Sequence, residues 1–255
     1  MLIGYDPYGG TMQRFTALEI IREVAKCGYD AINLPVRKDF ADPENETQLR
    51  AMQELIGSLG LKTPSVGVTP HTWAEPGKAA ETRKGIDQSI VIAKRFNARL
   101  LTMWPRLPPN VQHADAMRAL TESVQYAVPA ATAAGLSVAI EFEKNSTVDN
   151  YRDGLAFVAA TDARVRLVAD TYHMNNDKAD PHASVLAMRG QIGEVHLSGT
   201  HRGEPGSAGD TYDYAAFVRG LKETGFDGPV MLQYNLQDPV SIGRACQFAR
   251  RLFGR

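Results

Sequence analysis

Four short, mostly apolar runs in the second half of the chain each end in a residue that can bind a metal ion. These residues are Glu141, Asp170, His196 and Gln233. They follow one another at steps of 29, 26 and 37 positions, and each step leaves room for a strand, a helix and two loops. Because the carboxyl ends of parallel strands share one face of a sheet or barrel, we expect the four side chains to converge. Two carboxylates, an imidazole and an amide oxygen could then hold a divalent cation.

Two further residues near these positions could take part in proton transfer. Glu143 lies two positions after Glu141, so in a strand both side chains point the same way. It could support the ligand or act as a base, and the alternative is that it only begins a solvated loop. His173 follows Asp170 by three positions, which could place a proton-handling imidazole beside a ligand.

Asp170 and His196 also have purely structural alternatives. Asp is a frequent helix N-cap, but residues 171–176 do not resemble a clean helix start, which favours the ligand interpretation for Asp170. A histidine inside a strand is often a core residue with satisfied hydrogen bonds. The position of His196 among the other strand ends favours a ligand instead.

Arg202 and two tryptophans are the remaining candidates for substrate contact. Arg202 lies in a polar, glycine-containing segment at 198–210, and a guanidinium near a metal suits an enolate, hydroxyl or phosphate oxygen. Trp104 ends one expected strand and Trp73 follows another. Aromatic rings at such positions either stack on sugar faces or pack in the core.

Strands and helices alternate along the whole chain, and this alternation must position those residues. In the first half, strands are expected at 2–5, 31–35, 62–68 and 100–104, and helices at 15–27, 46–59, 79–96 and 114–134. In the second half, helices are expected at 150–160, 181–188, 214–224 and 240–253, between and after the four strands that carry the candidate ligands. Pro129 should kink the helix at 114–134 or start a new turn in it.

Eight strand–helix units without a linker predict one domain over 1–255, an α/β protein with a (β/α)₈ TIM barrel fold. No G-x-G-x-x-G follows the first expected strand, and no G-x-x-x-x-G-K-[ST] occurs anywhere in the chain. The dinucleotide-binding and P-loop alternatives therefore lose their main support.

Composition argues against some classes of partner. The chain has 255 residues, with 28 Lys and Arg against 29 Asp and Glu, and this balance weighs against a nucleic-acid partner. No apolar run approaches the roughly 18 residues of a membrane span, and the start lacks a signal-peptide pattern. We therefore expect a cytoplasmic protein without a membrane partner.

The motifs in the second half resemble the xylose isomerase-like TIM barrel family, also called sugar phosphate isomerases/epimerases. The resemblance lies in Val-Ala-Ile-Glu at 138–141, Val-Ala-Asp-Thr-Tyr-His-Met at 168–174, Val-His-Leu at 195–197, and the segments 206–217 and 225–228. It implies a divalent metal, of the Mn, Mg, Co or Zn group, bound by Glu141, Asp170, His196 and the residue at 233. It also implies that His173 and Arg202 contact the substrate, and that the protein forms homo-oligomers.

Gln233 departs from this family pattern, which has a second glutamate at that position. In the epimerases and isomerases of the family, the two glutamates move protons on opposite faces of the substrate. An amide has no useful pKa, so Gln233 cannot do this. Symmetric proton transfer by two glutamates is therefore not expected here.

The function that we expect is isomerisation or epimerisation of a small, sugar-like carbonyl compound through an ene-diolate. Glu141, His173 and Arg202 are the expected catalytic residues. A metal-dependent lyase or dehydratase that uses the same enolate is the first alternative. A barrel that binds a sugar without turnover is the second, and a DNA-repair endonuclease is the third.

Overall fold

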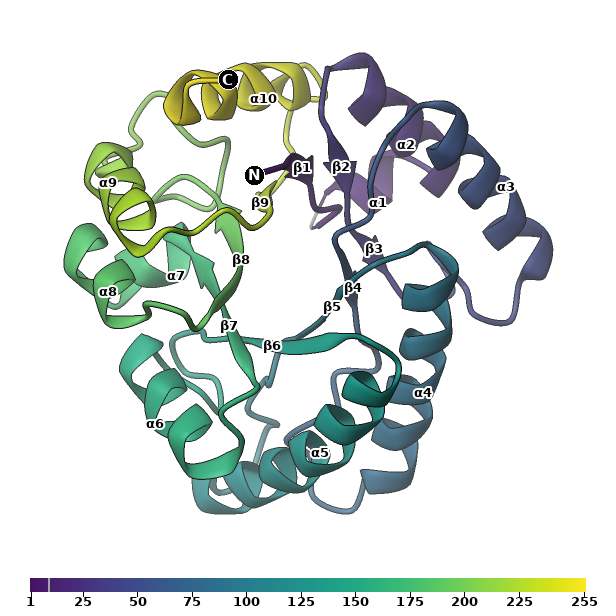
Figure 1. Cartoon of the computed structure of the whole chain (residues 1–255), viewed down its shortest axis with the longest axis vertical. Helices are drawn as coiled ribbons and strands as arrows, with labels where there is room; N and C mark the ends of the chain where they lie inside the picture. Colours follow the sequence, from purple (N-terminus) through teal and green to yellow (C-terminus); the bar gives the residue numbers. More distant parts are fainter. Residues whose placement is uncertain (9) are drawn as a thin grey trace.

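Parallel strands surround the centre of the molecule and helices cover them on the outside (Figure 1). The computed structural model describes residues 1–8 and 10–255. The strands are β1 (Ile3–Tyr5), β2 (Ala31–Ile32), β3 (Leu34–Pro35), β4 (Ser65–Gly67), β5 (Leu100–Met103), β6 (Ser137–Glu141), β7 (Arg166–Asp170), β8 (Ile192–Leu197) and β9 (Val230–Leu232). Their order around the sheet is β2-β1-β9-β8-β7-β6-β5-β4-β3.

The ends of this sheet meet within a single extended segment. β2 and β3 are separated only by Asn33, and together they match the strand expected at 31–35. The first part pairs with β1 through Gly4 and Ala31, and the second part pairs with β4 through Leu34 and Val66. The barrel therefore closes around eight strand positions, which confirms the (β/α)₈ prediction.

The helices lie close to where the sequence pattern predicts them. The longer ones are α2 (Ala17–Lys26), α3 (Glu46–Ser58), α4 (Ala79–Arg95), α5 (His113–Ala133), α6 (Tyr151–Thr161), α9 (Tyr214–Thr224) and α10 (Ser241–Phe253). The shorter ones are α1 (Thr11–Arg14), α7 (Thr171–Asn176) and α8 (Pro181–Ala187). Pro129 lies inside α5, which continues as one helix to Ala133.

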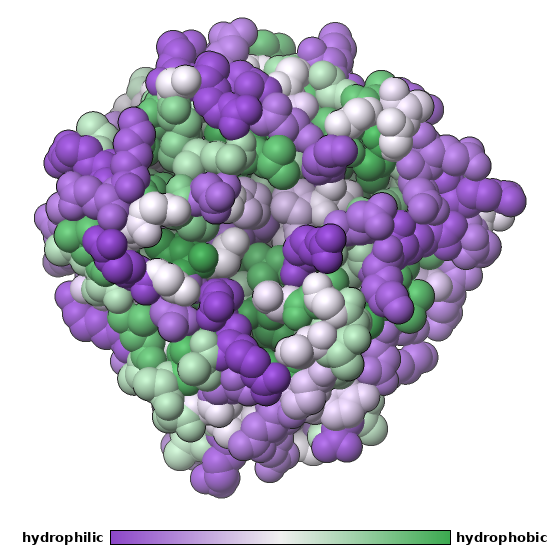
Figure 2. Space-filling view, viewed as in Figure 1, coloured by the Kyte–Doolittle hydropathy of each residue, from purple (hydrophilic) through white to green (hydrophobic). Residues whose placement is uncertain are grey.

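The helices are amphipathic and the strands are almost wholly buried. In α2, Ile20, Ile21 and Val24 face the core, and Thr16 and Glu19 form a capping box at its start. Hydrophilic side chains dominate the outer rim of the molecule, where the helices meet solvent (Figure 2). Strand side chains are covered by helices on one side and by the barrel interior on the other, so most strand positions are apolar.

Within the residues that the structure describes, no helix combines the length and the apolar character needed to cross a membrane.

Candidate active site

Three of the four predicted strand-end residues meet at the carboxyl ends of β6, β7 and β8. His196 Nδ1 lies 3.2 Å from Glu141 Oε1 and 3.9 Å from Asp170 Oδ2. Asp170 is fully buried and His196 nearly so. Parallel register brings them together, because Asp170 pairs with His196 across β7 and β8. Two carboxylate oxygens and one imidazole nitrogen therefore converge as donors.

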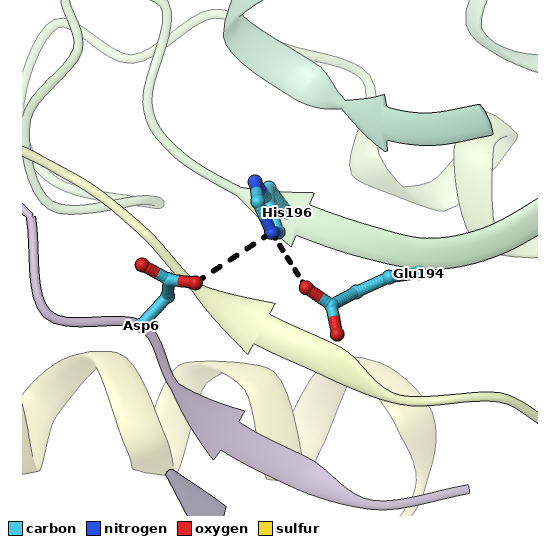
Figure 3. A group of neighbouring side chains, drawn as sticks. All are labelled: Asp6, Glu194 and His196. Carbon is cyan, nitrogen blue, oxygen red and sulfur yellow. Dashed lines mark hydrogen bonds and ion pairs between the residues drawn. The ribbon is translucent and has the colours of Figure 1, made fainter. Parts of the chain in front are cut away.

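The other ring nitrogen of His196 faces a second group of acidic residues. Nε2 lies 2.8 Å from Glu194 Oε1 and 3.9 Å from Asp6 Oδ2 (Figure 3). Glu194 lies two positions before His196 on the same strand and is fully buried. When a metal ion displaces the Nδ1 proton, a carboxylate that accepts the Nε2 proton keeps the Nδ1 lone pair directed at the space beside Glu141 and Asp170. This is the usual way in which a metal-binding histidine is oriented.

A buried hydrogen-bond network holds the Glu194 carboxylate in place. Asn33 Nδ2 and Ser65 Oγ donate to its Oε1 at 2.8 and 3.1 Å. Asn33 Nδ2 also donates to Asp6 Oδ2 at 2.8 Å. Asn33 lies at the break between β2 and β3. The closure of the barrel at this point therefore places Asn33 beside Glu194 and Asp6, below the site.

The charged groups shift one another's ionisation. Burial alone raises the pKa of Glu141, but His196, His173 and Arg202 outweigh it and lower the pKa to about 2. Burial lowers the pKa of His196, but the Glu141 and Glu194 carboxylates outweigh it and raise the pKa well above its usual value. Burial raises the pKa of Asp6 to about 6, and Glu194 adds to this while His196 opposes it.

Asp170 both caps a helix and faces the site. Its Oδ1 accepts the backbone N–H groups of Tyr172 and His173, at 2.7 and 3.4 Å, at the start of α7. The expectation that residues 171–176 do not begin a helix was therefore wrong. β7 runs directly into α7 without a loop, and a carboxylate with two oxygens can serve the helix with one and the site with the other.

Arg202 is held rigidly instead of extending into solvent. Its Nη1 donates to Asp170 Oδ2 at 2.6 Å and its Nη2 donates to Gln233 Oε1 at 2.5 Å. The guanidinium lies over the rings of Tyr8 and Tyr172, 4.9 and 5.0 Å from their centres, and the residue is 8% exposed. Gln233, the first residue after β9, thus directs its amide oxygen at Arg202.

A cavity of about 480 Å³ opens above these side chains. Its walls include the following predicted residues: Glu141, Glu143, His173, His196, Arg202 and Gln233. The volume suits a small ligand. Trp104 also lines the cavity, whereas Trp73 is buried in the core. Of the two tryptophans, only Trp104 is therefore placed to touch a substrate.

His173 and Glu143 stand beside Glu141 in this cavity. His173 Nε2 lies 3.8 Å from Glu141 Oε1, and its Nδ1 has no hydrogen-bond partner among the described residues. Glu143 lines the same wall, and burial raises the pKa of its carboxyl group. Both residues therefore line the space that a bound molecule would occupy.

Sequence reasoning missed three polar residues of the site: Asp6, Asn33 and Glu194. Asp6 follows the apolar strand β1 and so repeats the pattern by which the other four strand ends were recognised. Glu194 shares a strand face with His196 because the two residues are two positions apart. Asn33 carried no local signal, since its role depends on the barrel closure.

The donor set suits a divalent ion. Ligand atoms of Glu141, Asp170 and His173 lie within 4.8 Å of one another, and those of Asp6, Glu194 and His196 form a second such group. His196 joins the two groups through its opposite ring nitrogens. Oxygen and imidazole donors of this kind match Mg, Mn, Co or Zn.

Comparisons with known proteins identify a family and several relatives of this chain. A family model described as "Xylose isomerase-like TIM barrel" matches residues 21–252. An L-ribulose 3-epimerase of Mesorhizobium japonicum is 31% identical over 214 residues, covering 79% of this chain and 69% of the relative. An L-ribulose 3-epimerase of Methylomonas sp. (strain DH-1) is 27% identical over 238 residues, covering 89% of this chain and 81% of the relative.

Among solved structures, a D-psicose 3-epimerase studied in the presence of D-fructose superposes with a TM-score of 0.84. It is 16% identical, and all of both chains is covered. At this level of identity the likeness concerns the fold.

Proposed function

The chain belongs to the xylose isomerase-like TIM barrel family, and from this premise we propose that it is an isomerase or epimerase of small ketose-like sugars. The convergence of Glu141, His196 and Arg202 at one cavity is the observation that carries the proposal. The two L-ribulose 3-epimerase relatives support the same reaction class. A ketose has the carbonyl and the adjacent hydroxyl groups that such a site can bind.

In this proposal a divalent ion is held by Glu141, Asp170 and His196. When bound, such an ion supplies Lewis-acid polarisation of a carbonyl and an adjacent hydroxyl group. The orientation of His196 by Glu194 supports this assignment, because it directs Nδ1 at the two carboxylates.

Gln233 as a fourth ligand stays a prediction, since its oxygen also accepts from Arg202. If the amide coordinates, Gln233→Ala weakens metal binding, and isothermal titration calorimetry measures this. Unchanged metal affinity together with a higher KM would instead assign the amide to the positioning of Arg202.

The protein groups have separate tasks in the proposed reaction. Glu141, ionised at neutral pH, removes the proton on the carbon next to the carbonyl and so generates the ene-diolate. His173 lies beside Glu141 and can relay that proton. Arg202 holds a substrate oxygen with the N–H groups that Asp170 and Gln233 leave free. Trp104 supplies an apolar wall for the sugar.

A lyase or dehydratase that forms the same enolate is the second candidate. The observation that favours it is the amide at Gln233, which cannot transfer a proton to the far face of the substrate. Elimination needs one base to form the enolate and one leaving group, so it does not require a second acid–base residue at that position.

Incubation with ketoses distinguishes an isomerase or epimerase from a lyase and from a barrel that binds sugar without turnover. The protein is stripped with a chelator, reloaded separately with Mn, Mg, Co or Zn, and given L-ribulose, D-allulose or D-fructose in D₂O. We expect an epimer or isomer that carries deuterium at the reacting carbon, and loss of turnover on chelation. A dehydrated or cleaved product would identify the lyase. Binding of a ketose without product or deuterium would identify a non-catalytic barrel.

A further inference from the structure

Epimerisation needs two proton-transferring groups on opposite sides of the reacting carbon. One group removes a proton from one face, and the other delivers a proton to the opposite face. Glu141 occupies one side of the cavity. Gln233, at the end of β9, cannot serve on the other side, because its amide neither gives up nor accepts a proton at useful pH.

A carboxylate is present on the strand next to Gln233. β1 pairs with β9 with Tyr5 opposite Leu232, and the Asp6 N–H donates to the Leu232 carbonyl at 3.0 Å. Asp6 therefore follows β1 at the level at which Gln233 follows β9. Both side chains line the cavity.

We propose that Asp6 is the second catalytic carboxyl group of this site and acts on the substrate face opposite Glu141. The inference rests on the proposed epimerase function. The His196 ring separates the two carboxyl groups, since Glu141 lies 3.2 Å from Nδ1 and Asp6 lies 3.9 Å from Nε2. In Figure 3, Asp6 and Glu194 approach the same nitrogen of His196 from different directions.

The two oxygens of Asp6 have different surroundings. Oδ2 accepts from Asn33 Nδ2 at 2.8 Å and faces His196, which fixes the orientation of the carboxyl group. No group among residues 1–8 and 10–255 donates a hydrogen bond to Asp6 Oδ1. The Asp6 side chain is 14% exposed. Oδ1 is therefore the oxygen that can exchange a proton with a bound substrate.

The other nearby carboxyl groups fit this role less well. Glu194 is fully buried beneath His196, does not line the cavity, and already accepts from Asn33 and Ser65. Glu143 lines the cavity, but it follows Glu141 by two positions and so belongs to the same side. Asp170 is fully buried and engaged by Arg202 and by the start of α7.

The proton inventory balances without any co-reactant. Glu141 takes the proton from carbon, the C–H electron pair forms the carbon–carbon double bond, and the carbonyl electron pair moves onto oxygen. Asp6, as the carboxylic acid, then gives its proton to the same carbon from the opposite face while the carbonyl reforms. Glu141 ends protonated and Asp6 ends ionised, and exchange with water restores both. The reverse reaction exchanges their roles.

Deuterium exchange in Asp6→Asn tests the assignment, because the asparagine keeps the shape of the side chain and an oxygen for Asn33. With the metal-loaded protein in D₂O, we expect inversion to fall by about 10²-fold or more. The epimer whose proton faces Glu141 should still acquire deuterium without inversion, and the other epimer should not. Metal affinity, measured by calorimetry, should stay within about twofold of wild type. The same substitution at the exposed Asp227, which no hydrogen bond or ion pair engages among the described residues, should change none of these values.

Two results would overturn the inference. One is inversion at the wild-type rate in Asp6→Asn. The other is equal loss of exchange from both epimers with metal binding intact. If Asp6→Asn does not fold, the same measurements are made on Asp6→Ala, and the same results are expected. Absence of exchange in the wild-type protein is a different outcome, because it rejects the proposed function itself.

Discussion

At the scale of single residues, His196 connects the two halves of the site. Glu141 faces one ring nitrogen and Glu194 faces the other. The buried carboxylate beneath the ring determines which nitrogen is available above it and also increases the basicity of the ring. The properties of this histidine therefore depend on a residue that does not line the cavity.

Glu194→Gln should weaken divalent-metal binding by about 10- to 100-fold, because it removes the negative charge behind the His196 ring while preserving its volume. Calorimetric titration of the chelator-treated protein with Mn²⁺ measures the effect. Ser65→Ala, which removes only one donor to the same carboxylate, should have a smaller effect. Equal affinity in Glu194→Gln and wild type would contradict the role given to Glu194.

Arg202→Lys should raise KM by about tenfold or more, because an ammonium group cannot reproduce the planar contacts to Asp170 and Gln233. A lysine also loses the contacts of the guanidinium with the rings of Tyr8 and Tyr172. Steady-state kinetics on the best ketose measures the change. The assignment of Arg202 to substrate binding is rejected if KM is unchanged.

At the scale of elements, the segment between β8 and α9 is ordered by its own hydrogen bonds. Asp210 Oδ1 accepts the N–H of Thr200, and its Oδ2 accepts the N–H of Gly206 and the hydroxyl of Tyr214. Arg202 lies within this segment, so the loop serves as a support for the guanidinium. Burial raises the pKa of Asp210, but these donors outweigh it and lower the pKa below its usual value.

Asp210→Ala should loosen this loop, raise KM, and increase cleavage by proteases between residues 199 and 213. Limited proteolysis with mass spectrometry measures the cleavage in this segment, and steady-state kinetics measures KM. Because the folded pKa is lowered, the wild-type stabilisation is fully present above the unfolded pKa of 3.8 and is lost as the pH falls further. Protease resistance that is the same in the variant as in wild type would show that the Asp210 contacts do not order the loop.

At the scale of the whole molecule, the first and last parts of the chain are joined near the amino-terminal end of β1. Asp30 accepts from the Ile3 N–H at 2.9 Å and from Arg250 Nη2 at 2.8 Å. Arg250 also donates to the Gly28 carbonyl. Figure 1 shows the two termini on the same side of the barrel, next to α10. These contacts tie α10 to the strands that close the barrel.

Asp30→Asn should lower the free energy of unfolding by about 1–2 kcal/mol, because it removes a partly buried, charge-assisted pair. Urea denaturation followed by circular dichroism measures the loss. Asp39→Asn breaks an exposed pair with Arg37 and should cost less than about 1 kcal/mol. Equal effects of the two substitutions would argue against a special role of Asp30 in barrel closure.

The sequence by itself determined the order of strands and helices and most of the site. Apolar runs such as Val138 to Ile140 and the periodicity of helices such as 15–27 are local signals, so they survive without knowledge of the fold. Parallel strands place their carboxyl ends on one face. The convergence of Glu141, Asp170 and His196 therefore followed from their positions in the chain.

Only the tertiary structure decided which side chains face one another at that end of the barrel. Asn33 and Glu194 lie 161 positions apart, and barrel closure brings them to one carboxylate network with Asp6. Asp170 proved to be both a helix cap and a partner of Arg202. Local patterns determine elements because they depend on near neighbours in the chain. The partners of a polar side chain depend on strand register around the closed barrel, and no segment read alone contains that information.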